Sequence, residues 1–276
     1  MRSYLSIVAI YRDEAVYLKE WVEFHRIVGV ERFFLYDNFS VDEHREVLAP
    51  YVEEGIVVLN EWPVFPGQIP AYDDALRRHA SESRWIAFID LDEFLFSPTG
   101  KPLPEILSEY EHHPGVLANW AVFGSSGHRT RPTGLVIENY VRRMKAEEGH
   151  QQSKTILDPS RADRCGGAHF FYYREGAGSA VDEEHRPVPY GRTHHLAFDK
   201  LRVNHYYTKS IAEGKAKLER YAPTTGNPRT AARNRLELVD QDLNDVVDET
   251  ILMYAPELRR RLGLPPGDGA QPESSN

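Results

Sequence analysis

Three carboxylates stand at the end of an otherwise apolar stretch of the chain. The segment WIAFIDLDEFLF, residues 85–96, carries Asp90, Asp92 and Glu93 among aliphatic and aromatic residues. A buried carboxylate is costly unless it is paired, hydrogen-bonded or bound to a metal. In a strand, residues two apart point to the same side, so Asp90 and Asp92 project together. Such a pair of oxygen donors suits Mg²⁺ or Mn²⁺, which usually also bind substrate phosphates. The alternative is a pair of turn or capping carboxylates beside Lys or Arg.

The sequence lacks the signals of several common enzyme classes. It has no GxGxxG after the first apolar run, no GxxxxGK[ST], no HExxH, no paired CxxC and no GxSxG. These absences disfavour a dinucleotide oxidoreductase, a P-loop NTPase, a zinc protease and a serine hydrolase. They leave room for a phosphate-bearing substrate that is bound without a P-loop, and a nucleotide sugar fits that description.

Two other places carry polar groups next to apolar runs. RFFLYDN ends in Asp37 and Asn38, which are suited to a base or ribose hydroxyl, whereas Ser40 or Asp42 can cap the following helix. In VNHYYTKS, His205 and Lys209 stand within a polar cluster, where Lys209 is a possible phosphate partner. The other interpretation of His205 is a histidine packed in the core or lying at the surface.

The elements that position these groups alternate in the first hundred residues. Apolar runs at 4–10, 32–36, 55–60 and 85–89 predict strands covered on both faces. Helices are predicted at 14–28, at 40–49 with Pro50 as its end, and at 69–80. This alternation indicates an α/β fold with a doubly wound, mainly parallel sheet and helices on both faces.

The second half is less regular. Residues 116–124 and 133–141 are predicted as strands, 150–157, 168–173 and 200–207 as shorter ones, and the chain from 210 on is predicted as helical. We expect one domain over 1–264, with a nucleotide-binding half (1–100), an acceptor-binding half (101–210) and a helical C-terminal extension (211–264). The last residues, 265–276, lack aliphatic anchors, and we expect them to be disordered.

Composition excludes some partners and locations. The net charge of −9, with basic residues scattered along the chain, predicts no nucleic-acid partner. The single cysteine, Cys165, excludes an internal disulfide and fits a small buried side chain in a reducing compartment. The first apolar run is too short for a signal peptide or a bilayer span, so we expect no transmembrane segment and a cytoplasmic location.

Five ordered motifs carry a family resemblance. They are YRDEAxYLxEWVxFH, YDNxSxD, WxxFxDLDEFL, FGSSGH and NHYYTKS, and the similarity extends from about Tyr4 to Tyr221. The set resembles glycosyltransferase family 92 and its family-2-like relatives. The resemblance implies a GT-A-type fold and a metal-binding Asp-x-Asp. It further implies an inverting transfer of a sugar, such as galactose, from a UDP-sugar to a carbohydrate or other hydroxyl acceptor.

The resemblance also implies roles for individual residues. Asp90 and Asp92 hold Mn²⁺ or Mg²⁺, with His205 as third ligand and His169 as the next choice. The nucleotide and donor set consists of Arg12, Glu14, Asp37, Asn38, Gln68, Tyr72, Asp74 and Asp90, with Lys154 and Lys209 at the diphosphate. Trp120 and the 123–128 loop, with Gly124, Ser125 and Ser126, form the acceptor shelf.

The catalytic base stays open at this point. Inversion needs a base within hydrogen-bond reach of the acceptor hydroxyl. His169, His128, Glu93 and Asp182 are possible, although Glu93 adjoins the metal site and can serve merely to orient it. The rival classes are a sugar nucleotidyltransferase, whose Gly-rich loop is missing from YRDEAVYLKE, and a sugar-binding or scaffolding protein with a degenerate transferase fold.

Overall fold

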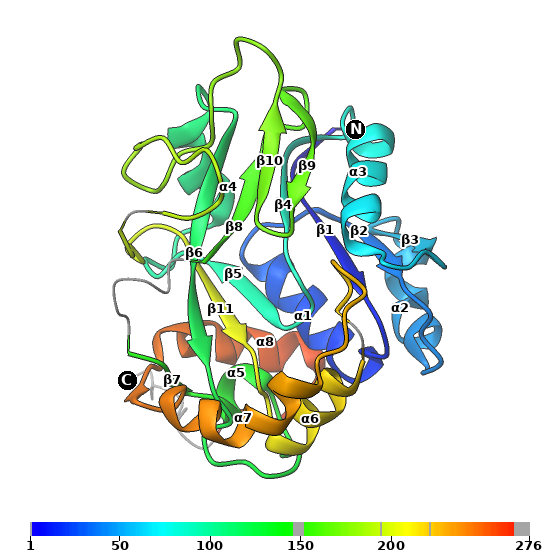
Figure 1. Cartoon of the computed structure of the whole chain (residues 1–276), viewed down its shortest axis with the longest axis vertical. Helices are drawn as coiled ribbons and strands as arrows, with labels where there is room; N and C mark the ends of the chain where they lie inside the picture. Colours follow the sequence, from blue (N-terminus) through cyan, green and yellow to red (C-terminus); the bar gives the residue numbers. More distant parts are fainter. Residues whose placement is uncertain (1, 146–151, 194, 221, 268–276) are drawn as a thin grey trace, which may run out of the picture.

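The N-terminal part alternates strands with helices, as predicted. The computed structural model describes residues 2–145, 152–193, 195–220 and 222–267 (Figure 1). The strands of this part pair in parallel in the order β3-β2-β1-β4. The elements are β1 (Ser3–Tyr11), α1 (Ala15–Ile27), β2 (Arg32–Asp37), α2 (His44–Glu53), β3 (Val57–Glu61), α3 (Gln68–His79) and β4 (Ser83–Phe88).

The second part extends the same sheet with mixed pairing. β8 lies between β4 and β6 and is antiparallel to both, while β11 pairs in parallel with β6 and antiparallel with β5. Over the described residues, the sheet therefore has ten strands and runs through both halves of the chain. The elements are β5 (Glu93–Phe96), α4 (Leu103–Leu107), η1 (Ser108–Tyr110), β6 (Gly115–Phe123), α5 (Val136–Asn139), β7 (Arg142–Arg143), β8 (Ser153–Leu157), β9 (Ala162–Gly167), β10 (Phe170–Tyr173) and β11 (Arg202–Tyr206).

The C-terminal extension is mostly helical, as predicted. It consists of α6 (Ile211–Glu219), α7 (Thr230–Asp242), the short strand β12 (Val246–Val247), η2 (Thr250–Tyr254) and α8 (Ala255–Leu262). Figure 1 shows α6 and α7 side by side, and α8 packs against α1. Residues 268–276 of the predicted disordered tail lie outside the described part of the chain.

Helices cover both faces of the parallel strands, which explains why these strands are apolar throughout. Ile7 of β1 belongs to the apolar cluster that contains Trp21 of α1, whereas its neighbour Val8 belongs to the cluster that contains Tyr72 of α3. Burying an aliphatic or aromatic side chain of this kind contributes about 1.5–3 kcal/mol relative to leaving it in water. The alternation along β1 therefore fixes both helical layers to the sheet, and the predicted α/β architecture is confirmed.

One predicted boundary and one predicted element are wrong. Pro50 lies inside α2, and the helix continues to Glu53. Because Glu46, four residues before Pro50, is exposed, water can satisfy the carbonyl that the proline leaves without a donor. The second error is residues 133–141, which were expected as a strand but contain α5. The carboxylate of Glu20 in α1 accepts hydrogen bonds from Val136 N (2.9 Å) and Ile137 N (3.3 Å), and so caps this short helix from another element.

Two smaller expectations concern Cys165 and the membrane. Cys165 is buried in β9, and burial raises the pKa of its thiol to about 12. Within the described ranges, the helices are too short or too polar to cross a bilayer.

Candidate active site

A cavity of about 620 Å³ opens where the parallel strands end. Arg12 follows β1, Asn38 follows β2 and Asp90 follows β4, and all three line it. Ligands of open α/β sheets bind outside the carboxyl ends of the strands. Of the predicted site residues, the structure brings together on this wall Arg12, Glu14, Asn38, Gln68, Asp90, Asp92, Trp120, His169 and His205.

Asp90 is held by three side chains. Its Oδ1 accepts from Gln68 Nε2 at 2.9 Å and from the Tyr72 hydroxyl at 3.4 Å, and its Oδ2 accepts from Lys154 Nζ at 2.7 Å. Gln68 and Tyr72 come from α3, and Lys154 from β8. Lys154 is fully buried, yet Asp90 and Glu93 outweigh that burial and keep its pKa above the usual value. Tyr72 and Lys154 therefore support Asp90 from behind the cavity wall.

Asp92 lies between a histidine and a lysine. His205 Nε2 of β11 is 3.4 Å from Asp92 Oδ2, and the Lys217 ammonium of α6 donates to the same oxygen. Although burial opposes ionisation, Lys217 and His205 hold the pKa of Asp92 well below its usual range. Burial lowers the pKa of His205 despite Asp92, which leaves the imidazole neutral and able to bind a metal.

Glu93 does not line the cavity. It is fully buried, its Oε2 accepts from the backbone N–H of Asp90 at 3.0 Å, and Lys154 Nζ lies 3.5 Å from Oε1. Burial and the neighbouring aspartates raise its pKa well above the usual value in spite of Lys154. This geometry makes Glu93 a residue that orients the turn carrying Asp90.

A metal ion fits the donors at this position. Asp92, Glu93 and His205 each offer a ligand atom, and these atoms lie within 4.8 Å of one another. His205 Nδ1 is buried and, among the described residues, has no hydrogen-bond partner. Carboxylates with a neutral imidazole are a suitable ligand set for Mn²⁺. Asp90 lines the same cavity, with Lys154 on one of its oxygens.

An aromatic wall separates this cavity from a second one. The Trp120 ring of β6 contacts both His205 (centroids 4.2 Å apart) and His169 (4.9 Å). His169 Nδ1 is 2.9 Å from the Ser153 carbonyl oxygen, and burial together with Lys154 lowers the histidine pKa to about 4. The second cavity, about 550 Å³, shares Trp120, His205 and Tyr207 with the first and adds Val122, Met144, Lys145, Gln152, Val239, Asp242, Leu243 and Asp245.

Sequence reasoning missed the cations that line the cavity together with the carboxylates. Lys217 and Arg220 stand at the end of α6, Arg229 stands just before α7, and all line the first cavity. The α6–α7 connection is anchored across the cavity, because Arg220 donates to the Arg12 carbonyl oxygen and Thr224 to Gln68 Oε1, both at 2.5 Å. The sequence offers only a weak signal for this segment, because the basic residues between 209 and 229 are no denser than those between 129 and 145.

Besides Tyr72 and Lys154, three more predicted donor residues lie outside the cavity wall. The Asp37 carboxylate accepts from Ser40 N at 2.9 Å and lies 3.4 Å from His44 Nε2. Asp74 accepts from the Tyr36 hydroxyl at 3.0 Å. Lys209 pairs with Glu14, which does line the cavity, at 3.1 Å.

The predicted acceptor loop is held by hydrogen bonds to α7 and to Asn244, which follows that helix. Ser125 N and Oγ donate to the Asp240 carboxylate at 2.8 and 2.6 Å, and Ser126 N donates to Asn244 Oδ1 at 2.7 Å. A Cβ at Gly124 would lie 2.6 Å from the Asn244 side chain, so a larger residue there would displace the side chain that binds Ser126. His128 Nε2 faces the Asn139 carbonyl oxygen at 3.2 Å. The structure brings none of these residues to the wall of either cavity described above.

Comparison with known proteins gives one extensive match and several partial ones. The profile of glycosyltransferase family 92 matches residues 5–247. A family 92 protein of Ricinus communis is 30% identical over 179 residues, which are 62% of this chain and 32% of that protein. The galactan beta-1,4-galactosyltransferase GALS3 of Arabidopsis thaliana is 28% identical over 106 residues, 35% of this chain and 21% of that protein. The chain thus spans about a third of the length of the first of these relatives.

Among solved structures, S. aureus TarS 1–349 superposes with a TM-score of 0.41 at 12% identity. The superposed region covers 94% of this chain and 71% of the TarS chain.

Proposed function

The chain belongs to glycosyltransferase family 92, and on that premise we propose that it transfers a sugar from a UDP-sugar to a hydroxyl of a carbohydrate acceptor, with inversion and with Mn²⁺ or Mg²⁺. The observation that carries the proposal is the first cavity, whose wall combines Asp90, Asp92 and His205 with the cations Lys217, Arg220 and Arg229. Its volume of about 620 Å³ lies within the range of small-molecule sites. The name of the Arabidopsis relative supports galactose as the first sugar to test.

The metal would be held by Asp92 and His205, with Asp90 beside them. When bound, a divalent ion supplies positive charge to the leaving diphosphate. Without it, Lys154 and Lys217 balance the two aspartates. Lys217 is 30% exposed and stands on the cavity wall, whereas the Lys154 side chain is 1% exposed. We therefore assign Lys217 to the diphosphate and keep Lys154 as the fixed partner of Asp90.

The nucleoside end belongs to the residues that follow β1 and β2. Arg12 and Asn38 line the cavity there. Asn38 Nδ2 donates to the carbonyl oxygens of Trp62 and Val64 at 2.7 and 2.9 Å, so its side chain is fixed before a ligand arrives. Preorganised groups of this kind reduce the ordering cost of binding.

His169 is the base that this geometry favours. Its Nδ1 must carry the proton to donate to the Ser153 carbonyl oxygen, so Nε2 keeps a lone pair. With a pKa of about 4, the ring is unprotonated at neutral pH. His169 lines the first cavity next to Trp120, which also lines the second. An acceptor in the second cavity would present its hydroxyl near this wall, with Lys145, Asp242 and Asp245 for its other polar groups.

A donor screen tests the proposal. Thermal unfolding is measured with a panel of nucleotide sugars, UDP-galactose first, with and without Mn²⁺, and UDP release is then followed with carbohydrate acceptors. We expect UDP and one UDP-sugar to raise the midpoint only when the metal is present, and UDP release to require both substrates. A panel in which no nucleotide sugar changes the midpoint in either condition contradicts the proposal.

A further inference from the structure

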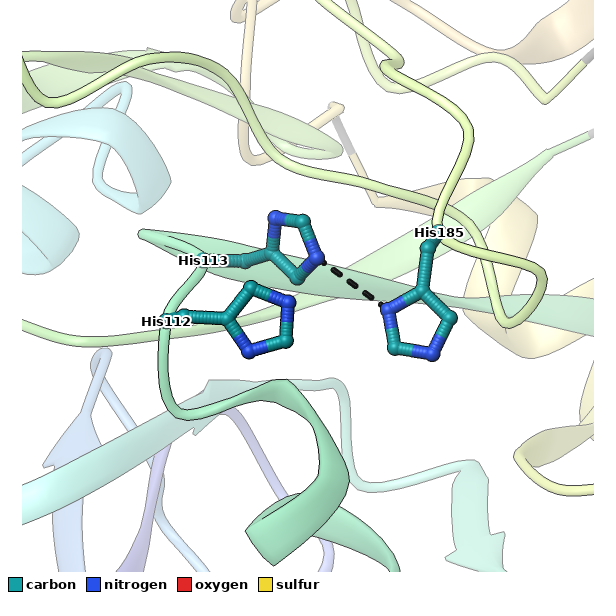
Figure 2. A group of neighbouring side chains, drawn as sticks. All are labelled: His112, His113 and His185. Atoms are coloured by element: carbon teal, nitrogen blue, oxygen red, sulfur yellow. Dashed lines mark hydrogen bonds between the residues drawn. The ribbon is translucent and has the colours of Figure 1, made fainter.

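Three histidines gather on the surface, outside both cavities. His113 Nε2 lies 3.1 Å from His185 Nδ1, and each imidazole, His112 included, offers a nitrogen within 4.8 Å of the other two. Figure 2 shows the His113–His185 contact, with the ring of His112 beside it. His112 is exposed and the other two are partly buried. The cluster is therefore open to solvent ions and separate from the proposed donor site.

Two turns that are far apart in the sequence bring these rings together. His112 and His113 stand between η1 and β6, where His113 N donates to Tyr110 O and Arg161 donates to His112 O, both at 2.8 Å. The backbone around both rings is thus fixed by hydrogen bonds.

His185 belongs to a turn organised by Asp182. The Asp182 carboxylate accepts from Glu184 N and Arg186 N, both at 3.0 Å. His185 has a φ of +64°, an uncommon conformation for a residue with a side chain, and the ring of Tyr110 stacks on its imidazole at 4.7 Å. The surrounding contacts therefore hold His185 where it meets His113.

We propose that His112, His113 and His185 bind a borderline divalent cation, with Zn²⁺ as the type case and solvent in the remaining position. Zn–N bonds of 2.0–2.1 Å in a tetrahedron place the nitrogens about 3.3 Å apart. The His113–His185 pair already meets that spacing. The exposed ring of His112 has the freedom to close the triangle by a rotation of its side chain.

The donor set distinguishes this site from the carboxylate site. Imidazole nitrogens suit Zn²⁺, Cu²⁺ and Ni²⁺, whereas carboxylate oxygens suit Mg²⁺ and Mn²⁺. The ligand atoms of this group are all imidazole nitrogens, with no carboxylate among them. The proposed ion thus differs in kind from the one assigned to Asp92 and does not depend on the transferase proposal.

The ion would join two parts of the fold that lead to the active site. Glu183, next to the Asp182 turn, accepts through its carboxylate from the backbone N–H groups of Asp199, Lys200 and Leu201 at 3.0–3.1 Å. These residues immediately precede β11, which carries His205. A metal that ties His185 to the His112–His113 turn would therefore restrain the segment entering β11.

The test uses the metal-stripped full chain without a histidine tag, titrated with ZnCl₂ by calorimetry and with Co²⁺ as a visible-absorption probe. We expect the parent to bind one Zn²⁺ per chain, and His113→Ala and His185→Asn each to lose it, because each removes an imidazole ligand. Asparagine is chosen at position 185 because it tolerates the positive φ of that turn. His195→Ala, an exposed histidine of the same loop, is the matched control and should bind as the parent does. Amides 199–201 should exchange more slowly with deuterium when Zn²⁺ is present.

Two further arms separate this site from the donor site. Asp92→Asn should keep the histidine-dependent Zn²⁺, and His185→Asn should bind UDP like the parent. The inference is overturned if the parent binds no Zn²⁺. It is equally overturned if the bound equivalent survives His113→Ala and His185→Asn together, or disappears in Asp92→Asn alone.

Discussion

At the scale of single residues, the two aspartates have different surroundings although they stand two positions apart. Asp90 is bound to Lys154, which is buried and fixed, while Asp92 faces His205 and the more exposed Lys217. Only the environment of Asp92 therefore combines a neutral imidazole with a cation that can leave. This difference assigns the metal chiefly to Asp92 and His205.

Replacing His205 by alanine tests its role as a ligand. Neutral imidazole suits Mn²⁺ better than Mg²⁺, so His205→Ala should reduce Mn²⁺-supported activity more than Mg²⁺-supported activity, with uridine binding unchanged. The measurement is UDP release at saturating donor with each metal. Equal losses with both metals, together with a lower unfolding midpoint, would reduce His205 to a packing residue beside Trp120.

The base is tested by comparing two histidines. His169→Gln should lower kcat by about 10²–10⁴-fold, the usual contribution of a general base, and leave KM for the donor nearly unchanged. His128→Gln is the matched control, because His128 lies on the wall of neither cavity. A parent-like kcat in His169→Gln would remove His169 from the mechanism.

Residue types could be predicted more reliably than their contacts. Asp90, Asp92 and His205 could be predicted as site residues because they follow or end apolar runs. Asp37 has the same sequence context, yet its carboxylate accepts a hydrogen bond from Ser40 N and lies beside His44. A single sequence does not indicate which of two such carboxylates will bind the backbone of its own turn and which will face a ligand.

At the scale of elements, α6 delivers the cation that the sequence did not reveal. Its capping box, in which Ser210 and Glu213 bond reciprocally, fixes the start of the helix. Lys217 is thereby placed against Asp92. Residues of the connection to α7 then line the cavity. The site is thus closed by the C-terminal extension as well as by the sheet.

Lys217→Met should change two affinities in opposite directions. Without the ammonium, no lysine competes with the metal for the Asp92 carboxylate, so Mn²⁺ alone should bind severalfold more tightly. UDP should bind about tenfold more weakly, because the diphosphate loses a charged hydrogen bond. Lys215→Met, on the same helix but paired with Glu237, is the control. Calorimetry that finds both affinities unchanged would contradict the role of Lys217.

Glu20 ties α5 to α1 and makes stability depend on pH. Burial raises its pKa to about 7 from 4.5, despite the N–H groups of Val136 and Ile137. Between these values the folded protein holds a proton that the unfolded chain has lost. Stability should therefore fall as the pH rises through this window, by up to about 1.4 kcal/mol per pH unit.

Urea unfolding at pH 5 and pH 8 measures this effect. Glu20→Gln should lose less stability than the parent between the two pH values, because it cannot ionise. Glu20→Ala, which also removes the cap, should be destabilised at both, by about 1–3 kcal/mol. Identical pH dependence in the parent and Glu20→Gln would show that Glu20 does not titrate as described.

The regular half of the sheet could be predicted because each parallel strand is buried on both faces and is therefore apolar along its length. The second half could not, because its elements depend on distant partners. Residues 136–139 are helical because Glu20 caps them, and β5 is a separate strand because β11 pairs with it. Such interactions leave no periodic pattern in the local sequence.

At the scale of the whole molecule, one sheet joins the two halves at the proposed active site. β11 lies between β5 and β6, so His205 of the second half meets Asp92, which follows the parallel strands of the first. A metal bound by both residues would couple donor binding to the relative position of the two halves. The account therefore depends on the metal being held at this junction by Asp92 and His205, with Asp90 beside them.

Calorimetric binding of UDP with MnCl₂ and with EDTA tests that claim most directly, in the parent, Asp90→Asn and Asp92→Asn. Asp163→Asn, which changes an exposed carboxylate of β9, is the control. We predict that Mn²⁺ strengthens UDP binding in the parent and in the control. Both site variants should lose this gain while keeping the parent's fold and its affinity for uridine. If Asp90→Asn and Asp92→Asn bind UDP with Mn²⁺ as tightly as the parent does, the assigned metal site is wrong.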